Sequence, residues 1–330
     1  MEIGKSRAES LVIMIIRLIF ASLLTFCAAV FLQGYWIRCL LRLNVSQTLK
    51  AYGPQRHLET KKGTPTMGGI VFPFAFFIGL VLARPIIDLT DSELFLVLFF
   101  PTAMAIIGLV DDGMKFMRHS SEGLSSLQKL TLQIFFCFPW ALLVSFGEGL
   151  SLWPGQVFSA GISVPILLFM SVGVLNAVNI TDGLDGLASG AFSISMIAGA
   201  FFFKTPWMVL SVIAAAVSLA FMWHNGHPAK IFMGDVGAHF LGGLLIVLCV
   251  RSQWTIALFP LGFIFGIEAI SVVIQLFSIW VRKKKIFLMS PIHHHFELLG
   301  WNETEIVLRF WLLHLLGMVF LLGLILMIIA

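Results

Sequence analysis

The chain has 330 residues, of which 59% are hydrophobic and only 12% charged, and its mean hydropathy is +0.98. An ordinary soluble domain carries about 25% charged residues, so a water-soluble globular fold is excluded. The formal net charge of +4 does not indicate a nucleic-acid partner, because cytoplasmic loops of membrane proteins carry an excess of Lys and Arg. The sequence predicts a polytopic membrane protein with no nucleic acid among its partners.

Apolar segments of about 20 residues have the length that a helix needs to cross a bilayer. The first is too long for the apolar part of a cleavable signal peptide, so we interpret it as a span. We expect one all-α integral membrane domain over residues 1–330 with about ten transmembrane helices. They are expected near 11–36, 69–87, 94–110, 126–146, 162–178, 186–203, 207–224, 237–251, 255–280 and 306–329.

The basic residues predict how these spans are oriented. Ten spans place both termini on one side and divide the loops into two alternating sets. The set 37–68, 111–125, 179–185, 225–236 and 281–305, with the flanking span ends, holds 14 of the 21 Lys and Arg residues, and the other set with the termini holds 5. The positive-inside rule therefore predicts that the first set is cytoplasmic and that both termini are extracytoplasmic.

Five short polar clusters interrupt the apolar chain, and all five fall in the cytoplasmic set. Ionisable residues beside lipid are costly and often mark function. Gathered at one face, they predict a single active site at the cytoplasmic surface. The clusters are Lys61–Gly69 (KKGTPTMGG), Asp111–Lys115 (DDGMK), Asn176–Gly186 (NAVNITDGLDG), Phe232–Gly237 (FMGDVG) and Pro291–Glu297 (PIHHHFE).

Asp111 and Asp112 are expected to end the third span. Adjacent carboxylates point about 100° apart on a helix, so one could bind a cation while the other acts as a base. The alternative is a solvated helix end. Aspartate at a helix C-terminus opposes the macrodipole, however, and Lys115 would supply only part of the compensation.

Asn176, Asn179, Asp182 and Asp185 recur at every third position. On a helix, neighbouring members share a face while the set drifts by roughly 60° per step. Consecutive pairs could therefore contact one ligand, although all four could not. An elaborate helix cap is the alternative, but two carboxylates and two amides exceed what one cap requires.

Asp235 precedes the eighth span and could either N-cap that helix or bind a hard metal ion. Mg²⁺ takes one or two carboxylates together with waters and substrate phosphate oxygens. Candidate ligands are Asp235 and Asp111 or Asp112, with Asp182 or Asp185 as further candidates. Mn²⁺ would fit the same ligands.

Basic and histidine side chains at this face indicate an anionic substrate. His293, His294 and His295 cannot all face one metal from a regular helix, and the Cys and spaced His partners of a zinc site are missing. Recognition of a phosphate or sugar is preferred to a merely polar loop. Lysines suit a phosphate-bearing substrate in the same way. They are Lys61, Lys62, Lys115 and Lys129.

Together these motifs resemble the polyprenyl-phosphate N-acetylhexosamine-1-phosphate transferase superfamily over essentially the whole chain. The aspartate pair and NxxNxxDGxDGL are typical of the superfamily, and PIHHHFE favours its muramoyl-pentapeptide branch over its N-acetylglucosamine branch. The sequence departs from the family at Gly113 and Met114, where an aromatic and an aliphatic residue are common. That change leaves both carboxylates and Lys115 in place.

The resemblance implies a transferase of the bacterial cytoplasmic membrane. It would move phospho-N-acetylmuramoyl-pentapeptide from its UDP carrier to undecaprenyl phosphate, giving lipid I and UMP, with Mg²⁺ as cofactor. Asp235 and one of Asp111 and Asp112 would act catalytically around Mg²⁺ and the lipid phosphate. The implied substrate-binding residues are Lys62, Thr66, Lys115, Lys129, Asn176, Asn179, Asp182, Asp185, Asn225, Phe232, His293, His294 and His295.

Other readings stay open at this point. A sister transferase that uses UDP-N-acetylglucosamine would share the carboxylates and differ in the histidine loop. A secondary transporter would place its ionisable site near the bilayer midplane and often shows repeated halves, and the sequence has neither feature. A single displacement competes with a covalent phospho-aspartyl mechanism. A homodimer is one option for the assembly, by resemblance only.

Overall fold

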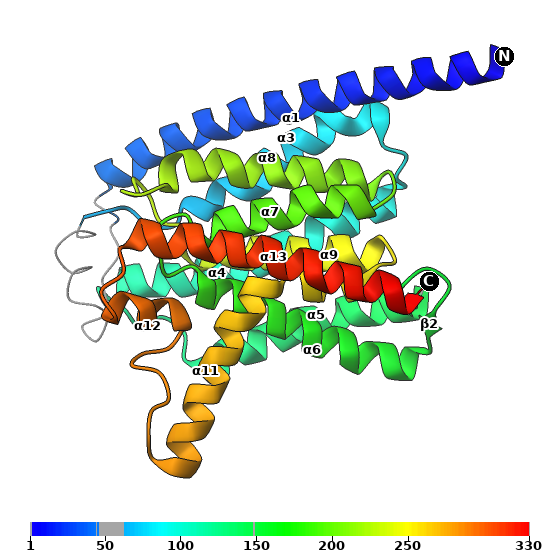
Figure 1. Cartoon of the computed structure of the whole chain (residues 1–330). Helices are drawn as coiled ribbons and strands as arrows, with labels where there is room; N and C mark the ends of the chain where they lie inside the picture. Colours follow the sequence, from blue (N-terminus) through cyan, green and yellow to red (C-terminus); the bar gives the residue numbers. More distant parts are fainter. Residues whose placement is uncertain (1, 44, 46–62, 148, 330) are drawn as a thin grey trace.

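The structure is a computed structural model that describes residues 2–43, 45, 63–147 and 149–329, with side chains from residue 9 onward. It is a bundle of long helices that run roughly along one direction (Figure 1). The helices are α1 (Glu2–Arg42), α3 (Val71–Ala83), α4 (Asp91–Met117), α5 (Ser126–Gly147), α6 (Ala160–Thr181), α7 (Leu187–Phe202), α8 (Trp207–Asn225), α9 (Gly234–Arg251), α10 (Leu258–Leu261), α11 (Phe263–Arg282), α12 (Ile292–Leu298) and α13 (Glu303–Ile329). Short 3-10 helices are η1 (Gly68–Ile70), η2 (Arg84–Ile86) and η3 (Thr255–Ala257).

Within the described part of the chain, nine helices are long and apolar enough to cross a membrane. Helices satisfy their own backbone hydrogen bonds, which is why they are the form that an apolar segment takes in lipid. The expected tenth span, 186–203, forms α7, a 16-residue apolar helix. At 1.5 Å per residue it measures about 24 Å, slightly less than the apolar layer of a bilayer. The predicted all-α membrane fold is confirmed.

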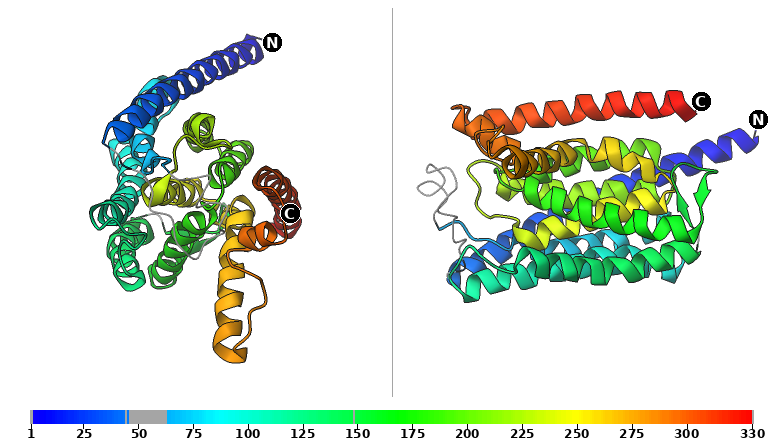
Figure 2. Two further views of the ribbon diagram at one scale, coloured as in Figure 1. Left: turned by 90° about the vertical axis from the view of Figure 1, so that its left-hand side faces the viewer. Right: turned by 90° about the horizontal axis from the view of Figure 1, so that it is seen from below.

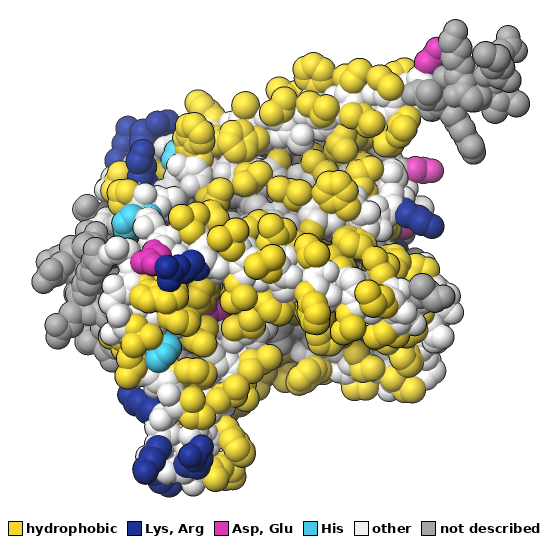
Figure 3. All heavy atoms as spheres, in the orientation of Figure 1, with side chains coloured by type: hydrophobic (Ala, Val, Ile, Leu, Met, Phe, Trp, Pro, Cys, Tyr) yellow, Lys and Arg dark blue, Asp and Glu magenta, His cyan; other side chains and the backbone are white. Residues whose placement is uncertain are grey.

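α9 lies at the centre of the bundle (Figure 2, left). It contacts α4, α6, α8 and η1, and 89% of its apolar stretch is buried, whereas only 11% of that of α1 is. Hydrophobic side chains cover the visible flank of the bundle, and basic and histidine side chains gather mainly at the end that carries α12 and at the tip of α11 (Figure 3). This pattern is the one expected of a protein surrounded by lipid.

Both chain ends lie at the same end of the bundle, as ten crossings require (Figures 1 and 2). At that end, β1 (Leu150–Ser151) and β2 (Val157–Phe158) pair antiparallel, with Leu150 opposite Phe158. This two-stranded hairpin connects α5 to α6.

One predicted helix end is wrong. α4 continues to Met117, so Asp111 and Asp112 lie inside the helix and not at its end. Lys115, one turn later, forms ion pairs with both carboxylates and so offsets the negative charge that would otherwise disfavour further helix. α6 ends at Thr181, three residues beyond the expected end, and Asp185 belongs to the following turn, inside the expected loop 179–185.

The expected span 255–280 is broken at Gly262, between α10 and α11. α11 then leaves the bundle at a steep angle (Figure 1). Side chains from neighbouring helices bind the backbone groups that the break leaves free. The Ser195 hydroxyl donates to Leu261 O at 2.6 Å, and His314 Nδ1 accepts from Ile264 N at 3.4 Å. Such contacts make a broken helix tolerable in lipid.

Candidate active site

Three carboxylates from two helices meet at one end of the bundle. Asp111 and Asp112 come from α4, and Asp235 comes from the first turn of α9. One oxygen of each lies within 4.8 Å of the others. The helices approach closely because Gly108 has no side chain, and a Cβ there would collide with the Asp235 backbone.

Asp235 could have been the N-cap of α9 or a metal ligand, and the first alternative is wrong. The N-cap is Met233, and it makes no side-chain cap bond. The Asp235 carboxylate sits in the first turn, where the positive end of the helix dipole favours a negative charge. Its side chain is therefore free to act in the cluster.

Two lysines bridge the three carboxylates. Lys115 Nζ lies 2.6 Å from Asp111 Oδ2, 3.2 Å from Asp112 Oδ1 and 3.2 Å from Asp235 Oδ1. Lys129, in the first turn of α5, lies 3.3 Å from Asp111 Oδ2 and also forms an ion pair with Asp235. With every group ionised, three negative charges face two positive ones. The remaining negative charge suits a divalent cation.

Neutral donors fix the direction of each carboxylate. Asp111 Oδ1 accepts from Leu124 N at 2.8 Å, and Asp112 Oδ2 accepts from Val236 N at 3.1 Å. The Asn179 amide donates to Asp235 Oδ1 at 3.0 Å. Buried charges need such partners to be stable.

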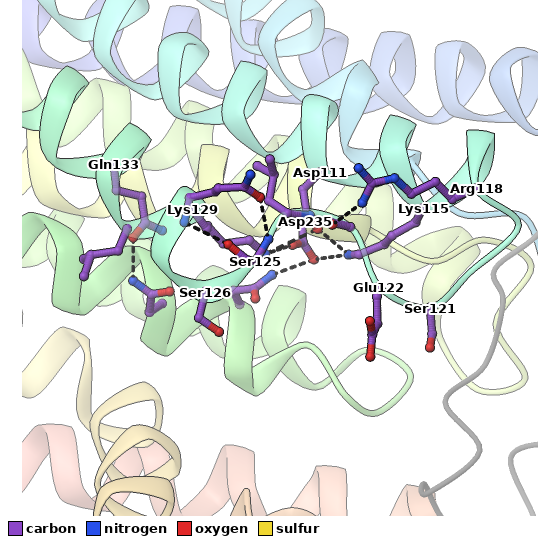
Figure 4. Close-up of a pocket in the computed structure, with 16 residues that line it drawn as sticks. Asp111, Lys115, Arg118, Ser121, Glu122, Ser125, Ser126, Lys129, Gln133 and Asp235 are labelled. Atoms are coloured by element: carbon purple, nitrogen blue, oxygen red, sulfur yellow. Dashed lines mark hydrogen bonds and ion pairs between the residues drawn. The ribbon is translucent and has the colours of Figure 1, made fainter.

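A cavity of about 840 Å³ opens beside the cluster (Figure 4). This volume is in the usual range for a small-molecule site. Asp111, Lys115, Lys129, Asn179 and Asp235 all contribute to its wall. The structure thus brings six predicted site residues to one cavity. They are these five together with Asn176.

The Asn176–Asp185 set divides into two pairs, because α6 ends at Thr181, between Asn179 and Asp182. Asn176 and Asn179 face the cavity from α6. Asp182 follows the end of α6, and neither it nor Asp185 lines the cavity. Asp185 Oδ2 accepts from Ala229 N at 3.0 Å and lies 2.9 Å from a nitrogen of His227. It joins the turn after α6 to the loop before α9.

The three histidines point in three directions from α12. His293 Nδ1 lies 3.1 Å from Glu268 Oε2 of α11, and both side chains are fully buried. His294 Nδ1 lies 2.6 Å from Glu297, and His295 Nδ1 accepts from Leu288 N at 3.2 Å. The expectation that they cannot share one metal agrees with this arrangement. None of them lines the cavity beside the aspartates.

Glu268 is a residue that the sequence reasoning missed. It is the only acidic residue in the expected span 255–280, and it is fully buried. Its position within an apolar segment was a usable signal, because intramembrane carboxylates tend to be functional. The ring of its partner His293 lies against Gly183, where a Cβ would collide with it.

Two loops are paired by their backbones next to Asp112. Gly68 N donates to Phe232 O and Gly69 N to Met233 O, each at 2.9 Å, and Phe232 N donates to Pro65 O at 2.8 Å. This pairing brings Thr66 and Phe232 close to the aspartates. A Cβ on Gly234 would lie 2.5 Å from Asp112 Oδ2 and 3.2 Å from Thr66 Oγ1.

Asn225 is buried, and both ends of its amide bind backbone. Oδ1 accepts from Gly186 N and Nδ2 donates to Ile231 O, each at 2.9 Å. Asn225 thus links the turn after α6 to the loop before α9, and it does not line the cavity. Lys61 and Lys62 lie outside the described residues.

Comparison with known proteins identifies a family for the chain. A model of glycosyl transferase family 4 matches residues 94–253, and a phospho-N-acetylmuramoyl-pentapeptide-transferase signature matches residues 61–72. Curated proteins of the latter name are similar over almost the whole chain. The protein from Shouchella clausii is 37% identical over 92% of this chain and 95% of its own length. Those from Caldanaerobacter subterraneus and Dictyoglomus thermophilum are 36% and 38% identical, over 92% and 91% of this chain and 98% and 96% of their own lengths.

The aspartate cluster at α4 and α9, the two backbone-paired loops beside it and this similarity lead to one conclusion. The chain belongs to the phospho-N-acetylmuramoyl-pentapeptide-transferase family.

Proposed function

We propose that the chain is one transmembrane transferase domain that moves phospho-N-acetylmuramoyl-pentapeptide from UDP-N-acetylmuramoyl-pentapeptide to undecaprenyl phosphate. The products are lipid I and UMP. The protein is a multi-pass protein of the bacterial cytoplasmic membrane. The observation that carries the proposal is the group of three aspartates and two lysines at the cavity, because diphosphate chemistry requires both a cation and fixed positive charge.

The cavity is proposed to open to the cytoplasm. Most Lys and Arg residues belong to the predicted cytoplasmic loops. α12 lies at the end of the bundle opposite the two chain ends (Figure 1). The cavity is formed where α4 and α6 finish and where α5 and α9 start, which is that same end by the alternation of the chain. A nucleotide from water and a lipid phosphate from the bilayer could meet there.

The three aspartates fit a magnesium site by their spacing and their net charge. Asp111, Asp112 and Asp235 would hold Mg²⁺. When bound, the ion would neutralise phosphate oxygens of both substrates. Mn²⁺ would suit the same oxygens.

In the proposed reaction, an oxygen of the lipid phosphate attacks the phosphorus joined to the sugar. The bond from that phosphorus to the bridging oxygen breaks, and UMP leaves with the electron pair. The second pKa of a phosphate monoester is about 6, so the attacking group is largely dianionic at neutral pH and a general base is less necessary than the aspartates suggest. Lys115 and Lys129 would offset the charge of the reacting phosphates.

The remaining predicted contacts are proposals for the donor substrate. Asn176, Asn179 and Asp182 would position the nucleotide sugar. The His293–His295 segment would contact its diphosphate or sugar, with His293 itself fully buried against Glu268. The paired loops would add Thr66 and Phe232. Lys62, Asp185 and Asn225 complete the predicted set.

The test is UMP release by the purified protein with both substrates, with and without Mg²⁺. We expect release to require the metal and both substrates, and to be abolished by Asp235→Asn. Asp91→Asn is the matched control, since Asp91 is fully exposed at the opposite end of α4. Turnover of UDP-N-acetylglucosamine in place of the muramoyl donor would favour the sister activity.

Two finer points need their own measurements. A phosphorylated enzyme trapped with the UDP-sugar alone would overturn the single displacement and favour a phospho-aspartyl intermediate. The homodimer stays a prediction from resemblance, and light scattering of the detergent-solubilised protein would test it.

A further inference from the structure

Three side chains form a hydrogen-bonded chain that connects α6 to α9 through α5, and two of them, Asn176 and Gln133, line the cavity. Asn176 Nδ2 lies 2.8 Å from Gln133 Oε1, and Gln133 Nε2 lies 3.0 Å from His239 Nε2. His239 Nδ1 lies 2.8 Å from the backbone oxygen of Asp235. Gln133 and His239 are buried, with 1% and 0% of their surface exposed. None of the proposed catalytic steps uses these two residues.

Backbone carbonyls at both ends fix the direction of every hydrogen bond in this chain. Asp235 O can only accept, so His239 carries its proton on Nδ1 and its Nε2 is an acceptor. Gln133 must then turn its amide N–H toward His239 and its oxygen toward Asn176. At the other end, Val172 O accepts from Asn176 Nδ2 at 2.8 Å. Because a carbonyl can only accept, this contact independently shows that Asn176 turns its amide nitrogen, and not its oxygen, toward Gln133.

This direction determines what Asn176 can offer a ligand. Both N–H groups of its amide are used, one by Gln133 and one by Val172 O. Within the described part of the chain no group donates to Oδ1, and Asn176 lines the cavity. The carbonyl oxygen is therefore the group that Asn176 can present to the cavity, and it can only accept a hydrogen bond.

We propose that Gln133 and His239 are positioning residues for the donor substrate. They hold Asn176 so that its oxygen accepts from an N–H or O–H of the nucleotide sugar, and they tie that contact to the Asp235 backbone. The proposal rests on the proposed function for the identity of the donor. The direction of the hydrogen bonds does not depend on it.

The first experiment reads the tautomer of His239 in the unmodified protein. Nitrogen-15 labelling of histidine gives distinct signals for protonated and unprotonated ring nitrogens, and His239→Gln identifies the His239 signals by their loss. We expect a neutral ring with the proton on Nδ1. A proton on Nε2 would overturn the proposal, whatever reaction the enzyme catalyses.

The second experiment separates positioning from mere packing. Gln133→Met keeps the volume and removes the hydrogen bonds. Losing a hydrogen bond to the substrate predicts a rise in the donor KM of roughly tenfold. The KM for undecaprenyl phosphate should stay within about twofold, because Asn176 is assigned to the donor alone.

Gln33→Met is the matched control, because Gln33 is also 1% exposed but lies on α1, away from the cavity. Its donor KM should equal that of the wild type. If Gln133→Met and Gln33→Met have the same donor KM, or if Gln133→Met raises the KM of both substrates equally, then Gln133 and His239 contribute only packing and the proposal is wrong. If Gln133→Met does not fold, Gln133→Asn has the same amide on a side chain too short to reach both partners, and the same KM pattern is expected. If the wild type is inactive with this donor, the proposed function is wrong. The tautomer of His239 would still show whether the hydrogen bonds from Asp235 to Asn176 run in the direction described.

Discussion

Lys129 of α5 forms an ion pair with Asp235 of α9, a residue 106 positions further along the chain. The same ammonium group reaches Asp111 of α4, so one lysine connects three helices at the cavity. A positive charge at this point opposes the binding of a metal ion and favours the binding of a phosphate. The balance between these two effects leads to the first prediction.

Replacing Lys129 by Met should lower kcat and strengthen metal binding together. Removing a fixed charge that stabilises the reacting phosphates is expected to lower kcat by about 10²- to 10³-fold. The aspartates lose a competitor, so half-maximal activity should need less Mg²⁺. Titration of UMP release with Mg²⁺ measures both effects. Lys204→Met, at the opposite end of the bundle, should change neither, and an increased Mg²⁺ requirement in Lys129→Met would contradict this account.

Gly108 should be intolerant of even a methyl group. A Cβ there collides with the Asp235 backbone, which cannot move without shifting α9. Overpacking of this kind costs about 1–3 kcal/mol, so Gly108→Ala should lower both the thermal stability and the rate of UMP release.

Gly113→Ala is the control on the same helix, because no atom lies within 4 Å of its Cβ position. Alanine favours a helix over glycine by about 0.5–1 kcal/mol, so this variant should be as stable as the wild type or slightly more stable. If Gly108→Ala and Gly113→Ala behaved alike, α4 and α9 would not be as close as the structure shows.

Much of the fold follows from the sequence because lipid makes the pattern simple. Each apolar segment forms a helix, and the loops rich in Lys and Arg predict which side of the membrane they lie on. The all-α bundle could therefore be expected without coordinates. The site was only partly predictable. Asp111, Asp235 and Asn179 could be named from their residue type and place, but Gln133 and His239 carry no sequence signal that separates them from ordinary buried polar residues. Their role depends on which atoms meet across three helices.

The length of α4 shows why local rules misplaced the end of a helix. Two adjacent aspartates were expected at its end because the apolar segment stops just before them, although a carboxylate at a helix C-terminus opposes the macrodipole. Lys115 and Lys129 supply the compensating charge, and Lys129 comes from another helix. The break at Gly262 has the same kind of cause, since Ser195 and His314 belong to other helices.

The break between α10 and α11 should depend on Ser195. Its hydroxyl donates to Leu261 O, a carbonyl that the break removes from the helical pattern. Ser195→Ala leaves this buried carbonyl without that donor, at a cost of about 1–3 kcal/mol. Thermal unfolding in detergent measures the loss. Ser193→Ala is the control, since Ser193 is equally buried on α7 and bonds only within its own helix to Ser189 O. Equal melting temperatures for the two variants would show that the break does not need Ser195.

Glu268 and His293 give the last prediction, because they are fully buried and face each other between α11 and α12. Glu268→Gln keeps an oxygen that can accept from His293, so we expect a modest loss of stability. Glu268→Leu leaves a buried histidine facing an apolar side chain, and a buried polar group without a partner costs about 1–3 kcal/mol. Thermal unfolding of the purified variants should rank wild type above Glu268→Gln and Glu268→Leu last. Glu305→Leu, at a surface glutamate that is 38% exposed on α13, should stay close to the wild type. A Glu268→Leu variant as stable as Glu305→Leu would mean that His293 finds another partner, and α12 would then not depend on α11 for its place beside Gly183.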